Sequence, residues 1–189
     1  MSFRTMIVAM SLCFAPVTLF AADNEDFHPY KNVKVGDFAT YKINVKVGQS
    51  LNVTGTSTQS VTAKSDKEAT IKVSGSVNGS DIPTQTQTID LTKPYDPTKV
   101  GALPPGFEGS VKKLKDGKEK VKLGTKEYDT NWQTFEVTAK AGGMDIKANV
   151  KVWMSKDITL GVVKMEMTAD VAAQKMEMTM ETMETGNKK

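Results

Sequence analysis

Methionine is the residue type whose number and spacing could support chemistry in this sequence. Eight of the eleven methionines lie between residues 144 and 183, and five alternate with polar residues in the runs Met165-Glu-Met167 and Met176-Glu-Met178-Thr-Met180. Thioether sulfur coordinates Cu(I), and residues two apart on a strand point to the same side. No histidine or cysteine lies near these runs, so we expect no metal and no cofactor. Core filling and an adaptable apolar surface, which flexible methionine suits, are the two interpretations left open.

The residues on which most enzymes depend are scarce. His28 is the only histidine and Cys13 the only cysteine, and both lie before the patterned part of the chain. No nucleophile elbow, phosphate-binding loop or dinucleotide fingerprint occurs. The acidic residues that can be placed fall on the polar positions of alternating runs: Glu166, Asp170, Glu177 and Glu181. We therefore predict no catalytic residues and a protein that is not an enzyme.

Lysine is concentrated in one stretch, residues 112–126. Its seven lysines are Lys112, Lys113, Lys115, Lys118, Lys120, Lys122 and Lys126, and only Asp116 and Glu119 oppose them. One interpretation is attraction to an anionic membrane surface or an envelope protein. The other is a hairpin that lysine keeps soluble, which also discourages pairing of sheet edges. Nucleic acid is not an expected partner, because no aromatic residues are interleaved on the lysine face.

The first 22 residues have the pattern of an export signal. Arg4, the only arginine, precedes an apolar run over residues 6–20 that is interrupted by Pro16 and followed by Ala21 and Ala22. A positive start, a short apolar core and small residues at the end are typical of a secretory signal peptide. We therefore expect a periplasmic or secreted protein, whose remaining 189 − 22 = 167 residues contain no cysteine.

The elements that must position these residues read as strands. After residue 22 the chain contains 20 threonines and 17 valines but only 6 leucines, a bias that favours sheet over helix. Apolar and polar residues alternate in about ten short runs, with turn signals such as Asn78-Gly79 and Asp116-Gly117 and an expected bulge near Gln133. The predicted fold is all-β: an antiparallel meander of about ten strands curled into a half-barrel or open barrel.

The expected organisation is simple. A signal peptide over residues 1–22 and a leader over 23–36 precede a single β domain over 37–185 and a polar tail over 186–189. Within the domain, residues 93–110 are rich in proline and glycine and cannot form a central strand. This segment is either an ordinary connecting loop or a lid, in which Leu103 and Phe107 would cover an opening in the sheet.

Two short motifs carry a family resemblance. The stretch VWMSKDITLGVVK (152–164) and the Val35-Gly36-Asp37-Phe38 run are similar to those of exported, mostly uncharacterised bacterial β-rich proteins. More distantly, the layout resembles the periplasmic lipoprotein-carrier superfamily, whose open half-barrel binds acyl chains. This resemblance implies that the inward face of the sheet is a lipid-binding surface. The chain differs from the carriers in having no arginine after residue 4 and no evident helix to plug the half-barrel.

Two functional hypotheses follow. The first is an exported, non-enzymatic envelope protein that binds a lipid or other apolar molecule on the concave face, in a cavity large enough for an acyl chain. Its candidate ligand-lining residues are Tyr41, Ile43, Val45, Val150, Val152, Met165, Met167, Met176, Met178 and Met180. The alternative is a structural or interaction protein of the envelope with a filled core and no ligand. Trp132 and Trp153 are expected to anchor the core in either case.

Overall fold

A computed structural model describes residues 28–48, 51–93, 108–141, 144–171 and 174–188. Nine strands run through these residues, and no helix occurs among them. The strands are β1 (Asp37–Val47), β2 (Leu51–Lys64), β3 (Glu68–Val77), β4 (Ser80–Asp90), β5 (Glu108–Leu123), β6 (Lys126–Ala141), β7 (Met144–Met154), β8 (Val162–Val171) and β9 (Gln174–Asn187). The predicted signal peptide and the lid candidates Leu103 and Phe107 lie outside the described residues.

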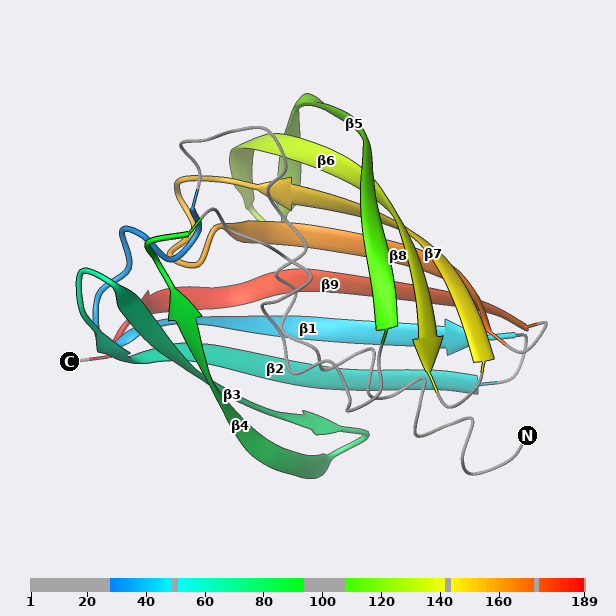
Figure 1. The fold of residues 1–189 in the computed structure, drawn as a ribbon, viewed down its shortest axis with the longest axis horizontal. Coiled ribbons are helices and arrows are strands. Elements are labelled where there is room, and N and C mark those ends of the chain that lie inside the picture. Colours follow the sequence, from blue (N-terminus) through cyan, green and yellow to red (C-terminus); the bar gives the residue numbers. More distant parts are fainter. Residues whose placement is uncertain (1–27, 49–50, 94–107, 142–143, 172–173, 189) are drawn as a thin grey trace.

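All nine strands belong to one antiparallel sheet in the order β4-β3-β2-β1-β9-β8-β7-β6-β5. Neighbouring strands are consecutive in the sequence except at the centre, where β1 pairs with β9 and joins the two halves of the sheet. The sheet curls strongly, and no pairing connects its outermost described strands, β4 and β5 (Figure 1). This confirms the predicted all-β, open half-barrel fold.

The turns explain why the structure has nine strands instead of about ten. Asn78 and Gly79, with φ angles of 47° and 82°, join β3 to β4 as predicted. The predicted turn at Asp116-Gly117 is wrong, because both residues lie inside the continuous strand β5, opposite Gln133 and Trp132. The hairpin instead turns at Gly124, whose φ of 59° falls in the region that glycine adopts without strain.

Strand β6 buries side chains on both of its faces. Phe135 and Val137 belong to the main hydrophobic cluster, whereas Trp132 and Tyr128 pack into a second cluster on the opposite face. The register between β6 and β7 runs without interruption from Asn131 to Ala141. The predicted bulge near Gln133 is therefore wrong: the change of parity reflects two separate cores, and the irregularity lies in β5, between Lys113 and Lys115.

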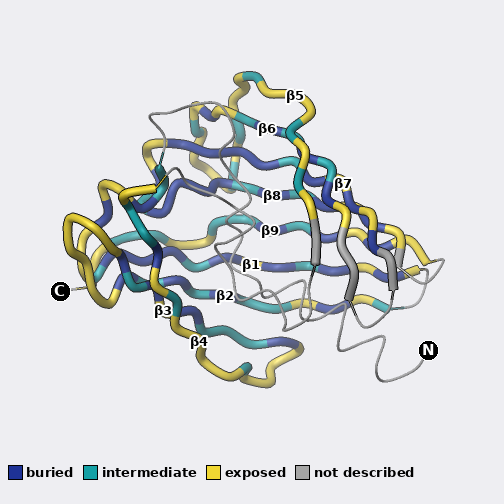
Figure 2. The backbone as a smooth tube through the Cα atoms, in the orientation of Figure 1, coloured by how far each residue is buried: buried dark blue, intermediate teal, exposed yellow. Residues whose placement is uncertain are grey.

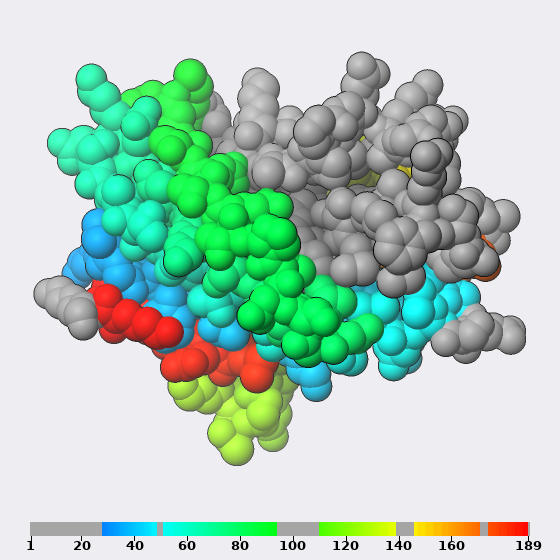
Figure 3. All heavy atoms as spheres, turned by 90° about the horizontal axis from the view of Figure 1, so that it is seen from below, coloured from blue at the N-terminus to red at the C-terminus, as the bar shows by residue number. Residues whose placement is uncertain are grey.

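The two outer strands differ in composition. Strand β4 carries Pro83 beside a register shift in its pairing with β3, which is typical of an edge strand. Strand β5 carries six of the seven lysines of the 112–126 stretch. In the space-filling view from below, the β3–β4 hairpin forms a continuous band across the surface on that side (Figure 3).

The main core lies on the concave side of the sheet, which we call the inner face. Its buried residues come from every strand except β5, and Figure 2 shows the buried positions alternating with exposed ones along the strands. Tyr30 and Val33, from the segment before β1, are also buried in this cluster. Gly36, at the end of that segment, is hydrogen-bonded to both neighbouring parts of the chain. Its N–H donates to the Val61 carbonyl, and its carbonyl accepts from the Lys188 N–H.

Candidate functional site

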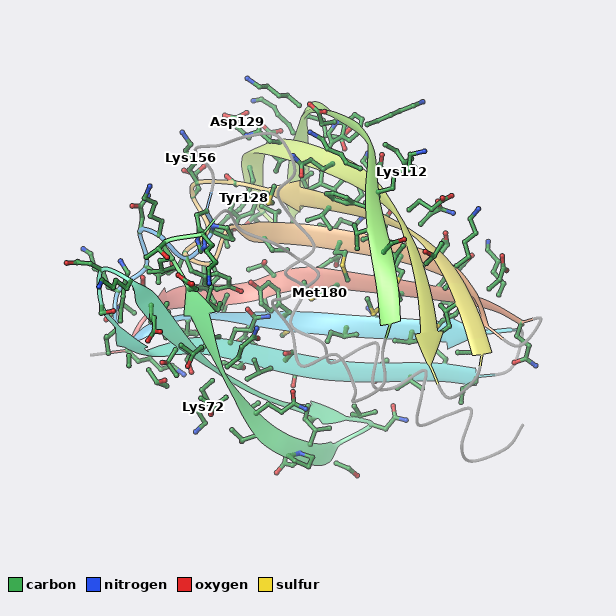
Figure 4. All side chains as sticks on the ribbon, viewed as in Figure 1. Lys72, Lys112, Tyr128, Asp129, Lys156 and Met180 are labelled. Carbon is green, nitrogen blue, oxygen red and sulfur yellow. The ribbon has the colours of Figure 1, made fainter. Side chains whose placement is uncertain are left out.

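The ten candidate lining residues all lie on the inner face. They belong to the main hydrophobic cluster, and each is between 0% and 6% exposed. Figure 4 shows Met180 within the curve of the sheet, while Lys72 and Lys112 lie outside it. The alternation of apolar and polar residues explains why these side chains share one face.

The strand register brings the five methionines into a ladder across β8 and β9. Met165 is opposite Met180, and Met167 is opposite Met178. Met176 is opposite Ala169 and extends the row of methionines along β9. On either side the ladder meets branched residues, Val152 and Val150 on β7 and Ile43 and Val45 on β1. The result is a continuous apolar surface with flexible side chains at its centre and stiffer ones at its margins.

A few polar side chains share this face. Ser57 and Gln59 on β2 and Gln133 on β6 are each no more than 6% exposed. The Gln133 Oε1 atom is buried and has no hydrogen-bond partner among the described residues. Burial and, secondarily, the nearby Tyr30 raise the pKa of Tyr41 far above the ordinary tyrosine value, so its hydroxyl stays neutral.

Sequence reasoning missed these polar residues, although a signal for them exists. Gln133 keeps the odd parity of Phe135 and Val137, and Gln59 keeps the odd parity of Val53 and Val61. An amide at an inward position of an alternating strand is a departure from the pattern, and it points to a polar group inside an apolar surface.

The burial of the inner face is common to both functional hypotheses. A filled core produces it, and so does an adaptable face whose side chains pack against one another. The two hypotheses differ in the stability cost of placing a larger side chain on this face. That cost is higher in a packed core than on an adaptable face.

The outer face carries a second cluster of a different kind, which we call the tryptophan cluster: Trp132, Trp153, Lys151, Lys164 and Glu119. Trp153 Nε1 donates to Glu119 Oε1, which also accepts from Lys151 Nζ at 2.9 Å. The Lys151 ammonium lies over both indole rings, 4.6 Å from the Trp132 centroid and 4.4 Å from that of Trp153. These bonds lower the pKa of Glu119, mainly through Lys151 and then through Trp153, so the carboxylate is ionised at neutral pH.

Gly117 makes this packing possible. A Cβ atom at this position would lie 2.7 Å from Cζ2 and 2.8 Å from Cε2 of Trp132. The indole therefore rests against bare backbone of β5. The Asp116-Gly117 pair, which the sequence suggested as a turn, instead provides the space for an aromatic ring.

A polar cavity of about 540 Å³ opens between β5, β6 and the connection from β7 to β8. Its lining residues are Lys118, Glu119, Lys120, Asp129, Thr130, Asn131, Ser155, Lys156 and Asp157. The buried hydroxyls at its base already have partners: Thr130 Oγ1 donates to the Glu119 carbonyl, and Ser155 Oγ accepts from the Asp157 N–H. Figure 4 places Asp129 and Lys156 near each other at this end of the sheet. The charges here are balanced and largely engaged, so this cavity offers less to an apolar ligand than the inner face.

The lysine-rich stretch forms the edge strand β5 and the start of β6. Lys113 pairs with Asp116 at 3.2 Å, and Lys120 pairs with Glu127 at 2.8 Å. The stretch is therefore partly neutralised within the molecule. It retains the composition of an edge that resists pairing with another sheet.

Metal centres and membrane-spanning helices are two further kinds of functional feature. Over the described ranges, no three or more histidine, cysteine, aspartate or glutamate residues gather as metal ligands would. In the same part of the chain, no helix is long and apolar enough to cross a membrane.

Comparison with known proteins supports the fold. No protein-family model and no curated protein matches the sequence. Among solved structures, the chain is similar to a putative exported protein with a YmcC-like fold from Bacteroides fragilis, with a TM-score of 0.52 and 8% identity, covering 82% of this chain and 97% of that one. It also matches a LolA superfamily protein from Nitrosomonas europaea at 7% identity over 93% and 94% of the two chains, but the TM-score of 0.29 is too low to argue from. The first likeness confirms the fold expected from the resemblance to exported β-rich proteins.

Proposed function

We propose that this protein is an exported, non-enzymatic envelope protein that binds a lipid or another apolar ligand on the inner face of its curved sheet. The observation that carries the proposal is the methionine ladder at the centre of that face, formed by Met165 and Met167 on β8 opposite Met180 and Met178 on β9. The export-type N-terminal pattern and the fold likeness to an exported protein support the location.

Methionine at these positions favours ligand binding over a purely structural core. Cores that need one fixed packing use branched and aromatic residues, which occupy few rotamers. Unbranched thioether side chains can repack around ligands of different shape, and protein surfaces that accept variable apolar partners use them for this purpose. Placing four of them on directly opposed positions concentrates that adaptability on β8 and β9, beside the junction with β1.

The lysine-rich edge gives a second element of the proposal. Strand β5 borders the same half-barrel and would attract an anionic membrane surface or an acidic envelope protein. That contact would bring the open side of the sheet close to the source of an apolar ligand.

A structural or interaction role with a filled core is the second candidate. A filled core accounts for the near-complete burial of the inner face without any ligand, since all ten candidate lining residues are at most 6% exposed. In that case the outer face and the lysine-rich edge would carry the activity.

Replacement of Met165 by tryptophan distinguishes the two candidates. An adaptable ligand face accepts the larger side chain at a cost below about 1 kcal/mol and loses affinity for an apolar probe by about tenfold, because the indole occupies the ligand volume. A filled core binds no probe and loses about 1–3 kcal/mol through overpacking. The measurements are urea unfolding and titration with the fluorescent probe 1-N-phenylnaphthylamine.

Met183→Trp is the matched control, because Met183 follows the same β9 methionine run but is 61% exposed. We expect it to change neither unfolding nor probe affinity. Native mass spectrometry of the protein purified from its exported fraction gives an independent result. A co-purifying lipid of defined mass supports the proposal, and a ligand-free mass that persists after addition of palmitate and phospholipid contradicts it.

A further inference from the structure

Gln133 is an exception on the inner face. It is 6% exposed, and its Oε1 atom has no hydrogen-bond partner within the described part of the chain. The register fixes its direction, because Gln133 is opposite Val152 on β7, a member of the main cluster. Residues directly opposite on antiparallel strands point to the same side of the sheet. The unpartnered acceptor is therefore on the inner face.

The row that begins at Gln133 is apolar for several strands. Val152 is followed by Met165 on β8, Met180 on β9 and Ile43 on β1. At a strand spacing of about 4.8 Å, the four steps from β6 to β1 span about 19 Å, comparable with an extended fatty acyl chain. Gln133 thus stands at one end of an apolar track of suitable length for a long-chain ligand.

The position next to Gln133 on β5 offers no unpaired charge to an ionic head group. Asp116 is opposite Gln133 on β5, and it pairs with Lys113 at 3.2 Å. The two charges satisfy each other at the rim of the face. A buried acceptor without a partner is costly to stability, and a neutral hydrogen-bond donor is what removes that cost.

We propose that Gln133 Oε1 accepts a hydrogen bond from the polar end of the bound molecule, while its apolar chain lies along Val152, Met165 and Met180. The ligand class is then a long-chain amphiphile with a neutral donor, such as an alcohol, an amide or a protonated carboxylic acid. A plain hydrocarbon, an ether or an ester without a donor leaves the acceptor unsatisfied. This inference rests on the proposed function and specifies its ligand.

A pair of probes whose oxygen carries either a hydrogen or a methyl group tests it. Dodecan-1-ol and dodecyl methyl ether compete against 1-N-phenylnaphthylamine for the wild-type protein and for Gln133→Met, which has nearly the same length without the amide. We expect the wild type to bind the alcohol about tenfold more tightly than the ether. In the variant the ratio falls to about one, because the orphan acceptor is gone. The variant also unfolds at a higher temperature than the wild type when no ligand is present.

Gln59→Met is the matched control. Gln59 is a second buried glutamine of the inner face, 4% exposed, on the opposite half of the sheet. It is expected to keep the wild-type preference for the alcohol. Equal affinities for the two probes in the wild type, or an unchanged ratio in Gln133→Met, overturn the inference but leave the proposed function standing, since both probes bind. If neither probe displaces the dye from the wild type, the proposed function fails and the inference fails with it.

Discussion

Two rows of side chains, one residue apart on the same strands, occupy opposite faces of the sheet. The inner row runs from Gln133 through Val152 and Met165 to Met180. The outer row follows the neighbouring positions, Trp132, Trp153, Lys164 and Glu181. Both rows cross β6, β7, β8 and β9, but the inner one is built from flexible apolar chains and the outer one from aromatic rings and charges.

The difference shows how one sheet can combine a fixed side with an adaptable one. On the outer face Trp153 is held by a hydrogen bond to Glu119 and by two lysine ammonium groups, Lys151 at 4.4 Å and Lys164 at 5.4 Å from its ring centroid. Such directional contacts define one geometry. On the inner face the methionine contacts are non-directional, and several packings have similar energies. The outer row therefore has contacts that define one geometry, and the inner row has side chains that can repack.

Trp153→Ala is expected to have the largest effect. It removes a buried indole, 6% exposed, together with the donor to Glu119, and costs about 3–5 kcal/mol of unfolding free energy. Because this indole helps to hold β5 and β6 against β7, hydrogen exchange should accelerate in β5 and β6 first. Urea unfolding and peptide-resolved exchange measure the two effects.

Phe135→Ala is the matched deletion on the inner face. Phe135 is 1% exposed, so the cost in stability should be similar, but the probe affinity should change as well. Trp153→Ala should leave the probe affinity of the folded fraction unaltered. If both variants change probe affinity equally, the proposal that only the inner face binds ligand is incorrect.

Gly117→Ala is expected to have an intermediate effect. The added methyl group would meet the Trp132 ring at 2.7 Å, and the indole must shift, at a cost of about 1–3 kcal/mol. Tryptophan fluorescence should report the displacement of the ring. Gly124→Ala is a different case, because nothing lies within 4 Å of the added atom and its cost comes from the positive φ alone. Its fluorescence should match the wild type.

Glu119→Gln is expected to have the smallest effect, below about 1 kcal/mol, because the carboxylate is 41% exposed. Its pKa is lowered in the folded protein by Lys151 and Trp153, so its stabilisation is complete above the ordinary glutamate pKa and is lost as the pH falls through the lowered value. The thermal midpoints of wild type and variant should therefore differ at pH 7 and converge towards pH 2. A difference that persists at pH 2 would show that the charge is not responsible.

Much of the fold could be predicted from the sequence because the alternation is local. The strands, the Asn78-Gly79 turn and the inward direction of the methionines all follow from residues within a few positions of each other. The Asp116-Gly117 pair was misleading because a sequence suited to a turn is also compatible with an extended strand. What decides between them is the Trp132 ring on the next strand, which is not a local feature.

The candidate site was only partly predictable for the same reason. The parity of Met165 and Met180 is visible in the chain, but their being opposite each other depends on the register between β8 and β9. The contact between Glu119 and Trp153 joins residues 34 positions apart and passes over the intervening strand β6. Gln133 breaks an apolar pattern, and only the register shows which side chains its amide faces.

The pairing of β1 with β9 has a consequence for how the chain folds. The first and last strands are neighbours at the centre of the sheet, with more than 120 residues between the paired positions Val47 and Met176. Neither half can complete its hydrogen bonding until the last strand has been synthesised, and closing so long a loop makes folding slow. Because β9 is the last strand to be synthesised, the native sheet and the methionine ladder can form only after β9 is complete.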